Sequence, residues 1–455
     1  MTVDQSQGRR VYSGLSAGWT ASTLSAVNAL VLTPTIIATL GFNGAAPWFL
    51  LDVVLASAAI LDLGAGRLYV HYLSSGRRYR RLAELERFCA LFNQASGVLA
   101  GACVALYYLL GEMSRANTLP EKTITALAIC LFGSACGHLA LSRVQSEVTG
   151  ELGRYTLKLG FVNLLGNSSA TAVAIATSTP SAVVTIHALV FAVLTYACFR
   201  PRSLLQAEAS HLSARAALTW AKRSAPFFLS SLPSLLMSPL VRGVSVIGLS
   251  SADFALFSFL LRAAGFVNNG FAVLTGQAHA IFRRLDRRSA ALFLARQSTV
   301  IATVSLILML LSLTLSDQAV SLVPNTLSVV LQPKFIIVVI GYGTTLVVLE
   351  LVLRNALANK AFLTLSMLRL LNLGVVAATA LALALLGRLS VTSLLWALTS
   401  SCLVTLAAGI QRLISRGTSS ACNGSLQSDD LPSFESTRFR SESKRQATTL
   451  REPNE

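Results

Sequence analysis

Apolar residues follow one another in long runs along this chain, and polar and charged residues gather between the runs. A helix that crosses the hydrocarbon core of a bilayer needs about 20 predominantly apolar residues, so the runs predict about twelve membrane-spanning helices. The predicted spans cover residues 14–40, 47–70, 88–110, 124–141, 160–176, 183–199, 226–249, 254–272, 298–315, 335–353, 362–386 and 394–414. The predicted fold class is therefore an all-α integral membrane protein.

Basic residues alternate between the connections that join these spans. The connections after the even-numbered spans are rich in arginine and lysine, whereas those after the odd-numbered spans are nearly bare. Cytoplasmic loops of membrane proteins carry such an excess of basic residues. We therefore expect both termini in the cytoplasm, and a wrong number of spans would have disturbed the alternation.

The longest basic connection, residues 200–223, lies midway along the chain. Transporters are often built from two repeats, so we expect bundles of about six helices each over residues 14–199 and 224–414, arranged around a central cavity. Beyond residue 415 the composition becomes rich in Ser, Thr and charge and poor in aliphatic residues. We expect a cytoplasmic N-terminus over residues 1–13 and a disordered cytoplasmic tail over residues 415–455.

The composition excludes a soluble enzyme. Of the 455 residues, 53% are hydrophobic and 13% are charged, and the mean hydropathy is +0.63. A net charge of +17 would suggest nucleic acid for a soluble protein, but here the placement of the basic residues follows membrane topology, so no nucleic-acid partner is expected. The first apolar run is too long for a signal-peptide core and is expected to stay as the first helix.

Motifs that carry catalytic or cofactor chemistry are missing from the sequence. There is no GxxxxGK[ST] pattern, the five histidines have no paired nucleophile, and the seven cysteines are scattered without a CxxC pair. An ATP-hydrolysing P-loop, a serine-type triad, a metal centre and a disulfide framework each require one of these patterns. We therefore expect neither an enzyme nor a cofactor.

A single arginine, Arg262, lies near the middle of the eighth span, within the stretch FSFLLRAAGF. A charged side chain at the centre of a membrane helix costs about 2.5–3.5 kcal/mol on insertion scales and therefore usually faces a water-filled cavity or a partner. Ser258 and Asn269 share the face of Arg262 at helical spacing. The seventh span carries a matching polar stripe, made of Ser234, Ser238 and Arg242.

Both arginines are expected at similar depth in the membrane. Arg242 and Arg262 lie on either side of a short turn near residue 250, roughly 12 and 18 Å from it at about 1.5 Å per residue. The serine stripes beside them favour a cationic cavity. For Arg242 the alternative is extension to the external surface, and for Arg262 it is a structural pair with a buried carboxylate such as Asp52.

Other charges within the spans are weaker candidates. Arg369 and Asn372, at positions i and i+3 of the eleventh span, are expected to line the same cavity. Glu350 and Arg354, at positions i and i+4 of the tenth, are expected to form a local ion pair.

The second span carries two carboxylates, Asp52 and Asp62, which are candidates for a coupling or a structural charge. Asp62 with Arg67 is either a pair at the end of the helix or a substrate contact, and the sequence leaves both interpretations open.

Proline and glycine mark two local features. Pro34 interrupts the first span and is expected to bend it. Gly97 and Gly101 in the third span form a small-xxx-small pair, which close packing against a neighbouring helix explains.

Two parts of the sequence resemble a known family. The stretch GLSAGWTASTLSAVNALVLTPTIIATLG, followed by WFLLDVVLASAAILDLGAGRLYVHYLS, resembles the first two helices of bacterial polysaccharide-export flippases of the O-antigen type. These flippases belong to the multidrug/oligosaccharidyl-lipid/polysaccharide exporter superfamily. The segment SAPFFLSSLPSLLMSPLVRGVSVIGLSSADFALFSFLLRAAG is similar to the start of the second half of that family. The residues that carry the resemblance are Gly18-Trp19, Leu32-Thr33-Pro34, Leu40-Gly41, Trp48 and Leu61-Asp62-Leu63-Gly64.

The resemblance implies a flippase in the bacterial cytoplasmic (inner) membrane that moves an oligosaccharide linked to undecaprenyl pyrophosphate to the outer leaflet, for surface or exported polysaccharide. A diphosphate requires fixed positive charge, which Arg242, Arg262 and Arg369 would supply. The serine and asparagine stripes suit sugar hydroxyls. The partners implied are the lipid-linked oligosaccharide, membrane lipids and other polysaccharide-assembly membrane proteins.

Two other classes of function stay open. A cation-coupled exporter of small molecules or drugs, from the same superfamily, would need acidic and aromatic groups in its cavity, and the excess of arginine in the spans argues against it. A non-transporting scaffold in a glycan-assembly complex is the third class. The family pattern is also broken after Gly41, where FNGAAPW replaces the usual Tyr-Gly or Phe-Gly pair, so the substrate is left open.

Overall fold

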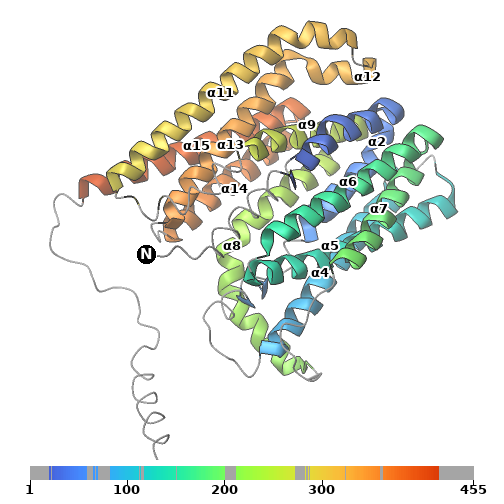
Figure 1. The fold of residues 1–455 in the computed structure, drawn as a ribbon, viewed down its shortest axis with the longest axis horizontal. Coiled ribbons are helices and arrows are strands. Elements are labelled where there is room, and N and C mark those ends of the chain that lie inside the picture. Colours follow the sequence, from blue (N-terminus) through green and yellow to red (C-terminus); the bar gives the residue numbers. More distant parts are fainter. Residues whose placement is uncertain are drawn as a thin grey trace, which may run out of the picture. The chain divides into compact units, whose positions relative to one another are not determined.

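The computed structural model describes residues 20–21, 23–58, 65–66, 68–69, 82–111, 113, 117–149, 151–199, 212–271, 282, 285, 287–322, 324–358 and 362–419 (Figure 1). The elements, in chain order, are the π-helix η1 (Asn28–Leu32), α2 (Thr33–Ala58), α4 (Leu82–Leu110), α5 (Leu119–Thr149), α6 (Leu152–Thr177), α7 (Pro180–Cys198), α8 (Ala214–Gly248), α9 (Ser251–Gly270), α11 (Arg287–Leu322), α12 (Asn325–Ser328), the 3-10 helix η4 (Val329–Leu331), α13 (Pro333–Ala358), α14 (Phe362–Leu385) and α15 (Val391–Ser419). The chain divides into two compact units, Met1–Gly409 and Ile410–Glu455. All contacts described below lie within the first unit.

The described residues are mostly helical and contain no strand, which confirms the all-α fold class. Among them, nine helices are long and apolar enough to cross a membrane. One of the nine, Thr23–Ala58, contains Gly41 with φ 69° and ψ 170°, so the chain leaves the helical conformation there and begins a new helical segment. The protein is a multi-pass membrane protein, and the number of twelve spans stays a prediction.

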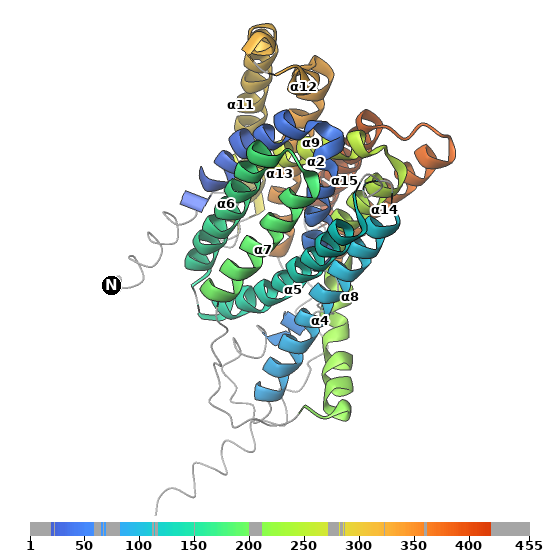
Figure 2. The same cartoon turned by 90° about the vertical axis from the view of Figure 1, so that its right-hand side faces the viewer.

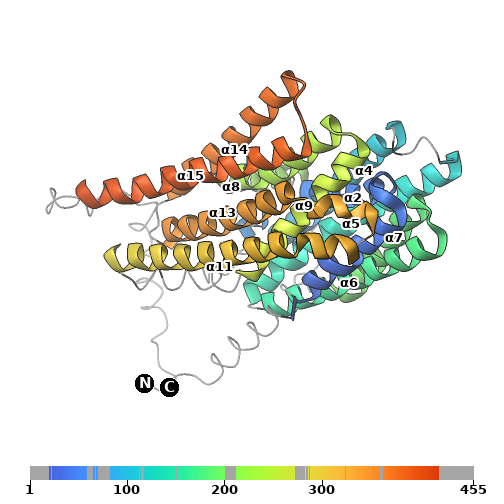
Figure 3. The ribbon, with the colours of Figure 1, turned by 90° about the horizontal axis from the view of Figure 1, so that it is seen from above.

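Helix α11 shows the surface that a membrane protein presents to lipid. The large hydrophobic side chains that it exposes are all aliphatic. They are Leu292, Val300, Val304, Leu306, Ile307, Leu308, Leu310, Leu311 and Leu315. A soluble protein rarely exposes so continuous an apolar face, whereas acyl chains cover it without loss. Figure 3 shows α11 running beside α13, and the two helices pack together.

The first helices pack closely with one another. Helix α4 lies along α5 and helix α6 along α7, and α2 contacts all four (Figures 1 and 2). Glycines allow the closest of these contacts, because a Cβ atom on Gly97 of α4 would overlap the carbonyl oxygen of Gly133 in α5. A Cβ atom on Gly101 would also lie 3.0 Å from the backbone of Cys130. The expected close packing at Gly97 and Gly101 is confirmed.

The later helices form their own contacts: α8 packs on α14, and α13 packs on α9, α11 and α14. Helix α2 also contacts α8 and α9, so it is one of the elements at which the earlier and the later helices meet. The bundle boundaries at residues 14–199 and 224–414 stay a prediction. The expected N-terminal segment 1–13 and residues 420–455 of the expected tail lie outside the described residues.

Helix α8 begins earlier than the apolar pattern suggests. It starts at Ala214, inside the basic connection 200–223, because Ser213 caps it by accepting a hydrogen bond from the backbone N–H of Ala216 at 3.2 Å. The turn into α9 lies at Leu249 and Ser250, where the hydroxyl of Ser250 caps α9 through Asp253. This short turn makes α8 and α9 consecutive helices with their arginines on either side of it.

Candidate functional site

Three charged side chains meet where α2 contacts α8 and α9, and we refer to Asp52, Arg242 and Arg262 as the charge cluster. Arg262 donates two hydrogen bonds to Asp52, from Nε to Oδ2 at 2.9 Å and from Nη2 to Oδ1 at 2.8 Å. Arg242 Nη1 lies 3.2 Å from the same Oδ2. A planar guanidinium and a carboxylate match in such a two-bond arrangement, which is the strongest form of this ion pair.

Arg262 has further partners on α2. Its Nη1 donates to the hydroxyl of Thr33 at 3.1 Å. Its guanidinium also lies over two aromatic rings, 4.3 Å from the centroid of Trp48 and 4.8 Å from that of Phe49. A guanidinium is attracted to the face of an aromatic ring, most strongly to that of tryptophan. Each nitrogen of this guanidinium therefore has a partner.

Pro34 explains how Thr33 comes to face Arg262. A proline has no N–H to donate and its ring crowds the carbonyl of the preceding turn, so the helix must widen before it. The chain does so as the π-helix η1, in which the backbone N–H of Thr33 bonds to the carbonyl of Asn28. The Thr33 hydroxyl donates to the same carbonyl at 2.8 Å. A π-helical turn thus directly precedes Pro34, and π-bulges of this kind are frequent at functional sites. The expected bend at Pro34 stays a prediction.

The residues after Gly41 supply the other side of the cluster. Trp48 and Asp52 are four residues apart on α2, so they share one helix face and contact the same guanidinium. Trp48 is 1% exposed and its indole nitrogen donates to His187 Nδ1 of α7 at 3.2 Å. The hydrogen bond to His187 fixes the edge of the indole, and the guanidinium of Arg262 lies over the ring face.

Arg242 is held less completely than Arg262. Its Nε lies 3.4 Å from the hydroxyl of Ser238, at the outer limit of a hydrogen bond. Its Nη1 makes the ion pair with Asp52 by distance alone, because this buried nitrogen has no partner in hydrogen-bonding geometry among the described residues. Arg242 therefore keeps a hydrogen-bond donor that the cluster does not use.

Arg242 and Arg262 reach the same carboxylate, so they lie side by side, and their depth in the membrane stays a prediction. The sequence predicts that Arg262 either faces a cationic cavity or pairs with a buried carboxylate, and the contacts show the pair with Asp52. The side chains of Asp52, Arg242 and Arg262 are 16%, 18% and 21% exposed, so the cluster is largely buried without being sealed. A role for these arginines in substrate binding stays a prediction.

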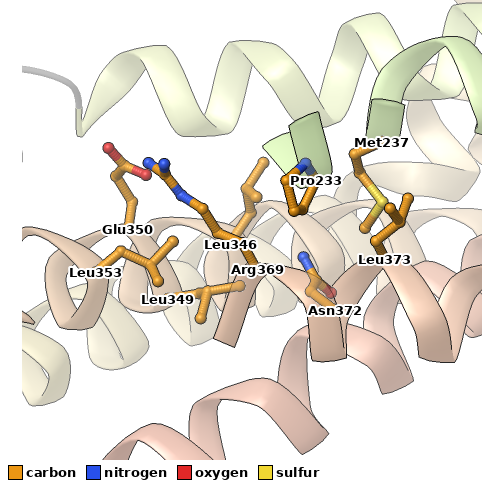
Figure 4. A pocket seen from close by; sticks show the side chains of 9 residues that line it. All are labelled: Pro233, Met237, Leu346, Leu349, Glu350, Leu353, Arg369, Asn372 and Leu373. Carbon is orange, nitrogen blue, oxygen red and sulfur yellow. The ribbon is translucent and has the colours of Figure 1, made fainter. Parts of the chain in front are cut away.

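Arg369 and Asn372 line a separate cavity of about 230 Å³ between α8, α13 and α14. Pro233 and Met237 of α8 form part of its wall, and leucines of α13 and α14 form most of the rest. Figure 4 shows the guanidinium of Arg369 extending toward Glu350. The amide oxygen of Asn372 is buried and has no hydrogen-bond partner among the described residues.

Glu350 is engaged on its own helix. Arg354 Nε donates to its carboxylate at 3.0 Å, so the expected local ion pair at positions i and i+4 is confirmed. Arg369 and Asn372 line a cavity, but Arg242 and Arg262 are not among its lining residues. The cavity and the charge cluster are therefore separate sites in the fold.

The remaining candidate residues differ in exposure, and some of their side chains are not described. Ser238 is exposed on α8, whereas Ser258 is fully buried and its hydroxyl has no partner among the described residues. Ser234 and Asn269 lie in α8 and α9, but their side chains are outside the part that the structure describes. Asp62 and Arg67 lie outside the described residues. Their roles stay predictions.

Sequence reasoning did not place Thr33, Trp48 and Phe49 around Arg262. Two signals in the sequence point to them. Trp48 lies four residues before Asp52 on the same helix face, so a partner of that carboxylate can also reach the indole, and Thr33 immediately precedes a helix-breaking proline. Neither signal says that the partner is Arg262.

Comparison with known proteins identifies the fold. No family model matches the chain, and no curated protein matches it. Among solved structures, the lipid II flippase MurJ in its inward closed conformation is similar with a TM-score of 0.67 and 11% sequence identity, over 88% of this chain and 87% of that chain.

Two multidrug resistance MATE family transporters of the MOP superfamily are similar as well. The inward-facing one gives a TM-score of 0.54 at 12% identity, over 89% of this chain and 99% of that chain. The outward-facing one gives 0.50 at 12% identity, over 91% and 96%. The chain therefore has the fold of MOP-superfamily transporters.

Proposed function

We propose that this protein is a flippase that moves an oligosaccharide linked to undecaprenyl pyrophosphate from the cytoplasmic to the outer leaflet of a bacterial inner membrane. The observation that carries the proposal is the charge cluster, in which two arginines share one aspartate. Two positive charges and one negative charge leave this largely buried cluster with an excess of one positive charge. A buried excess of charge is expensive and is normally retained for a ligand of opposite sign.

The position of the cluster suits transport. Asp52 belongs to α2, and the arginines belong to α8 and α9. Substrate sites of transporters built from two halves lie near the membrane midplane, where the halves meet. A ligand bound at this point would contact elements of both sets of helices, and that contact is what couples binding to their relative movement.

The chemistry of the cluster suits a diphosphate. An arginine stays protonated in a low-dielectric site and offers several donors to phosphate oxygens. Arg242 has a buried nitrogen without a hydrogen-bond partner among the described residues, so it is the arginine best able to accept a phosphate. The cavity with Arg369 and Asn372 supplies a further charged and polar surface. Ser234, Ser238, Ser258 and Asn269 are proposed to meet the sugar.

The likeness to known structures supports transport of a lipid-linked substrate without deciding it. The structure similar at a TM-score of 0.67 is described as a lipid II flippase, and those at 0.54 and 0.50 as multidrug resistance transporters. We propose cytoplasmic termini from the basic loops, and other polysaccharide-assembly membrane proteins as neighbours.

A cation-coupled drug exporter is the second candidate, favoured only by the MATE likeness. A cationic drug would need a carboxylate that is available to it. Asp52 is occupied by two arginines, and Glu350 by Arg354. The carboxylates of Asp52 and Glu350 are thus each paired with arginine, which leaves little negative charge there for a cationic drug to bind.

A flipping assay in proteoliposomes tests the proposal. A polyprenyl-diphosphate oligosaccharide with a fluorescent label on the sugar is incorporated with the protein, and dithionite is added outside. If the protein flips this lipid, dithionite should quench the label from both leaflets. In vesicles with the double variant Arg242→Gln/Arg262→Gln, only the outer-leaflet label should be lost.

Two controls separate the candidates. A labelled neutral polyprenyl lipid without phosphate should not be flipped. Ethidium uptake driven by a proton or sodium gradient should be absent. Ethidium transport together with no flipping would replace the flippase by the drug exporter.

A further inference from the structure

The charge cluster contains its own anion. Asp52 occupies both arginines, and it comes from a different helix than either of them. Any anionic ligand that binds these arginines must therefore compete with Asp52. When the ligand leaves, Asp52 is the group that returns.

The competition is uneven between the two arginines. Arg262 is held by two hydrogen bonds to Asp52, a third to Thr33, and the ring of Trp48. Arg242 is held by one ion pair without hydrogen-bonding geometry and by a 3.4 Å contact to Ser238. Arg242 is thus the arginine that Asp52 gives up more easily, and Arg262 the one that keeps Asp52 in place.

An internal anion changes both steps of a transport cycle. Because Asp52 is fixed on α2, it is already positioned to pair with an arginine. A ligand from the membrane loses freedom of motion when it binds, so competition with Asp52 lowers the affinity for the ligand. Conversely, an arginine left without a counter-charge in a buried site is unfavourable, so the return of Asp52 favours departure of the ligand. Efficient conduction or transport requires binding that is weak enough to allow release.

We propose that Asp52 is an internal counter-anion that competes with the substrate diphosphate for Arg242, so that re-forming the Arg242–Asp52 pair drives substrate release. This inference rests on the proposed function. Asp52 does not contact the substrate as a ligand in this mechanism. It acts through Arg242, as a positioning residue that limits how long the diphosphate is held.

The test measures affinity and turnover on the same variant. The purified full-length protein is titrated with inorganic pyrophosphate by calorimetry, and flipping is followed in proteoliposomes. Asp52→Asn should bind pyrophosphate about tenfold more tightly, which corresponds to about 1.4 kcal/mol. Its flipping should show a lower half-saturation concentration of lipid together with a lower maximal rate. A residue with a purely structural role would lower the rate without tightening the binding.

Asp253→Asn is the matched control. It is the same substitution on an exposed carboxylate at the first turn of α9, where Asp253 accepts a hydrogen bond from Ser250. It should leave pyrophosphate affinity and flipping unchanged. Equal tightening in Asp52→Asn and Asp253→Asn would mean that only overall charge matters, and it would overturn the proposal.

A second variant covers the case in which Asp52→Asn does not fold. Asp52→Asn/Arg262→Gln removes one charge of each sign, so its net charge equals that of the unaltered cluster while Arg242 loses its competitor. It should bind pyrophosphate at least as tightly as the unaltered protein, and weaker binding overturns the proposal.

The two proposals fail in different ways. If Arg242→Ala abolishes pyrophosphate binding but Asp52→Asn leaves the affinity unchanged, the competition is wrong and the flippase stands. If neither the unaltered protein nor Asp52→Asn binds pyrophosphate through the arginines, the diphosphate site itself is wrong, and the inference falls with it.

Discussion

Arg262 and Asp52 are 210 residues apart in the chain and are joined by two hydrogen bonds of 2.8 and 2.9 Å. The pair ties α9 to α2. Arg242 shares the same carboxylate, so the three side chains form one electrostatic unit and not two independent sites. The consequences of substitution depend on this sharing.

Arg262→Ala should destabilise the protein without unfolding it. The variant loses three hydrogen bonds and the contact with Trp48, but Asp52 keeps Arg242 as a counter-ion. We expect a loss of about 2–4 kcal/mol in the free energy of unfolding. Thermal melting in detergent measures it, with Arg388→Ala, an exposed arginine in the turn after α14, as the control. An unchanged melting temperature in Arg262→Ala would show that the pair contributes no stability.

Asp52→Asn should be more destabilising than either arginine substitution. It leaves two neighbouring guanidiniums without a counter-charge, and two like charges repel in a largely buried site. Adding Arg262→Gln to Asp52→Asn removes that repulsion and should restore part of the melting temperature. A double-mutant cycle measures the coupling, and strictly additive effects would contradict the shared ion pair.

The glycine contact between α4 and α5 should tolerate no side chain. A Cβ atom on Gly97 meets the backbone of Gly133 and Gly137, which cannot move aside as a flexible side chain would. Gly97→Ala should therefore lower the melting temperature in detergent. The control is Gly374→Ala on α14, where nothing lies within 4 Å of an added Cβ and alanine favours the helix by up to about 1 kcal/mol. A similar response of the two variants would argue against close packing at Gly97.

Thiol labelling should distinguish the serines of the two polar stripes. Ser238→Cys, exposed on α8, should react with a small water-soluble reagent in the state described here. Ser258→Cys and Leu260→Cys replace residues that are 0% and 1% exposed, and both should be protected in that state. If Ser258 lines the transport path, Ser258→Cys should react during turnover while Leu260→Cys stays protected. Protection of both throughout the cycle would make Ser258 part of a helix-packing seam.

The membrane topology can be checked with reporter fusions. A reporter that is active only outside the cytoplasm should be silent after Arg81, Arg223 or Arg416, because the basic loops are retained inside. The same reporter should be active within residues 111–123, the predicted connection between the third and fourth spans. One inverted result would break the alternation on which the twelve predicted spans depend.

The sequence alone determined the fold class and the identity of the charged candidates. A run of apolar residues is a local property, and in lipid a segment of that length must satisfy its own backbone hydrogen bonds, so it forms a helix wherever it lies in the fold. The local ion pair of Glu350 and Arg354, the distortion before Pro34 and the close packing at Gly97 were predictable for the same reason. Each depends on residues within a turn or two, or on the absence of a side chain.

Only the tertiary structure decided which partner each buried charge has. The stripe on α9 shows that Arg262 faces something polar, but several carboxylates and cavities would satisfy that pattern. The choice of Asp52 depends on the helix break at Gly41, on the π-turn that presents Thr33, and on how α2 packs against α8 and α9. Arg369 carries a similar sequence signal and lines a different cavity. A helical period fixes the direction in which a side chain points along its own helix, and only the packing of the helices fixes what it meets there.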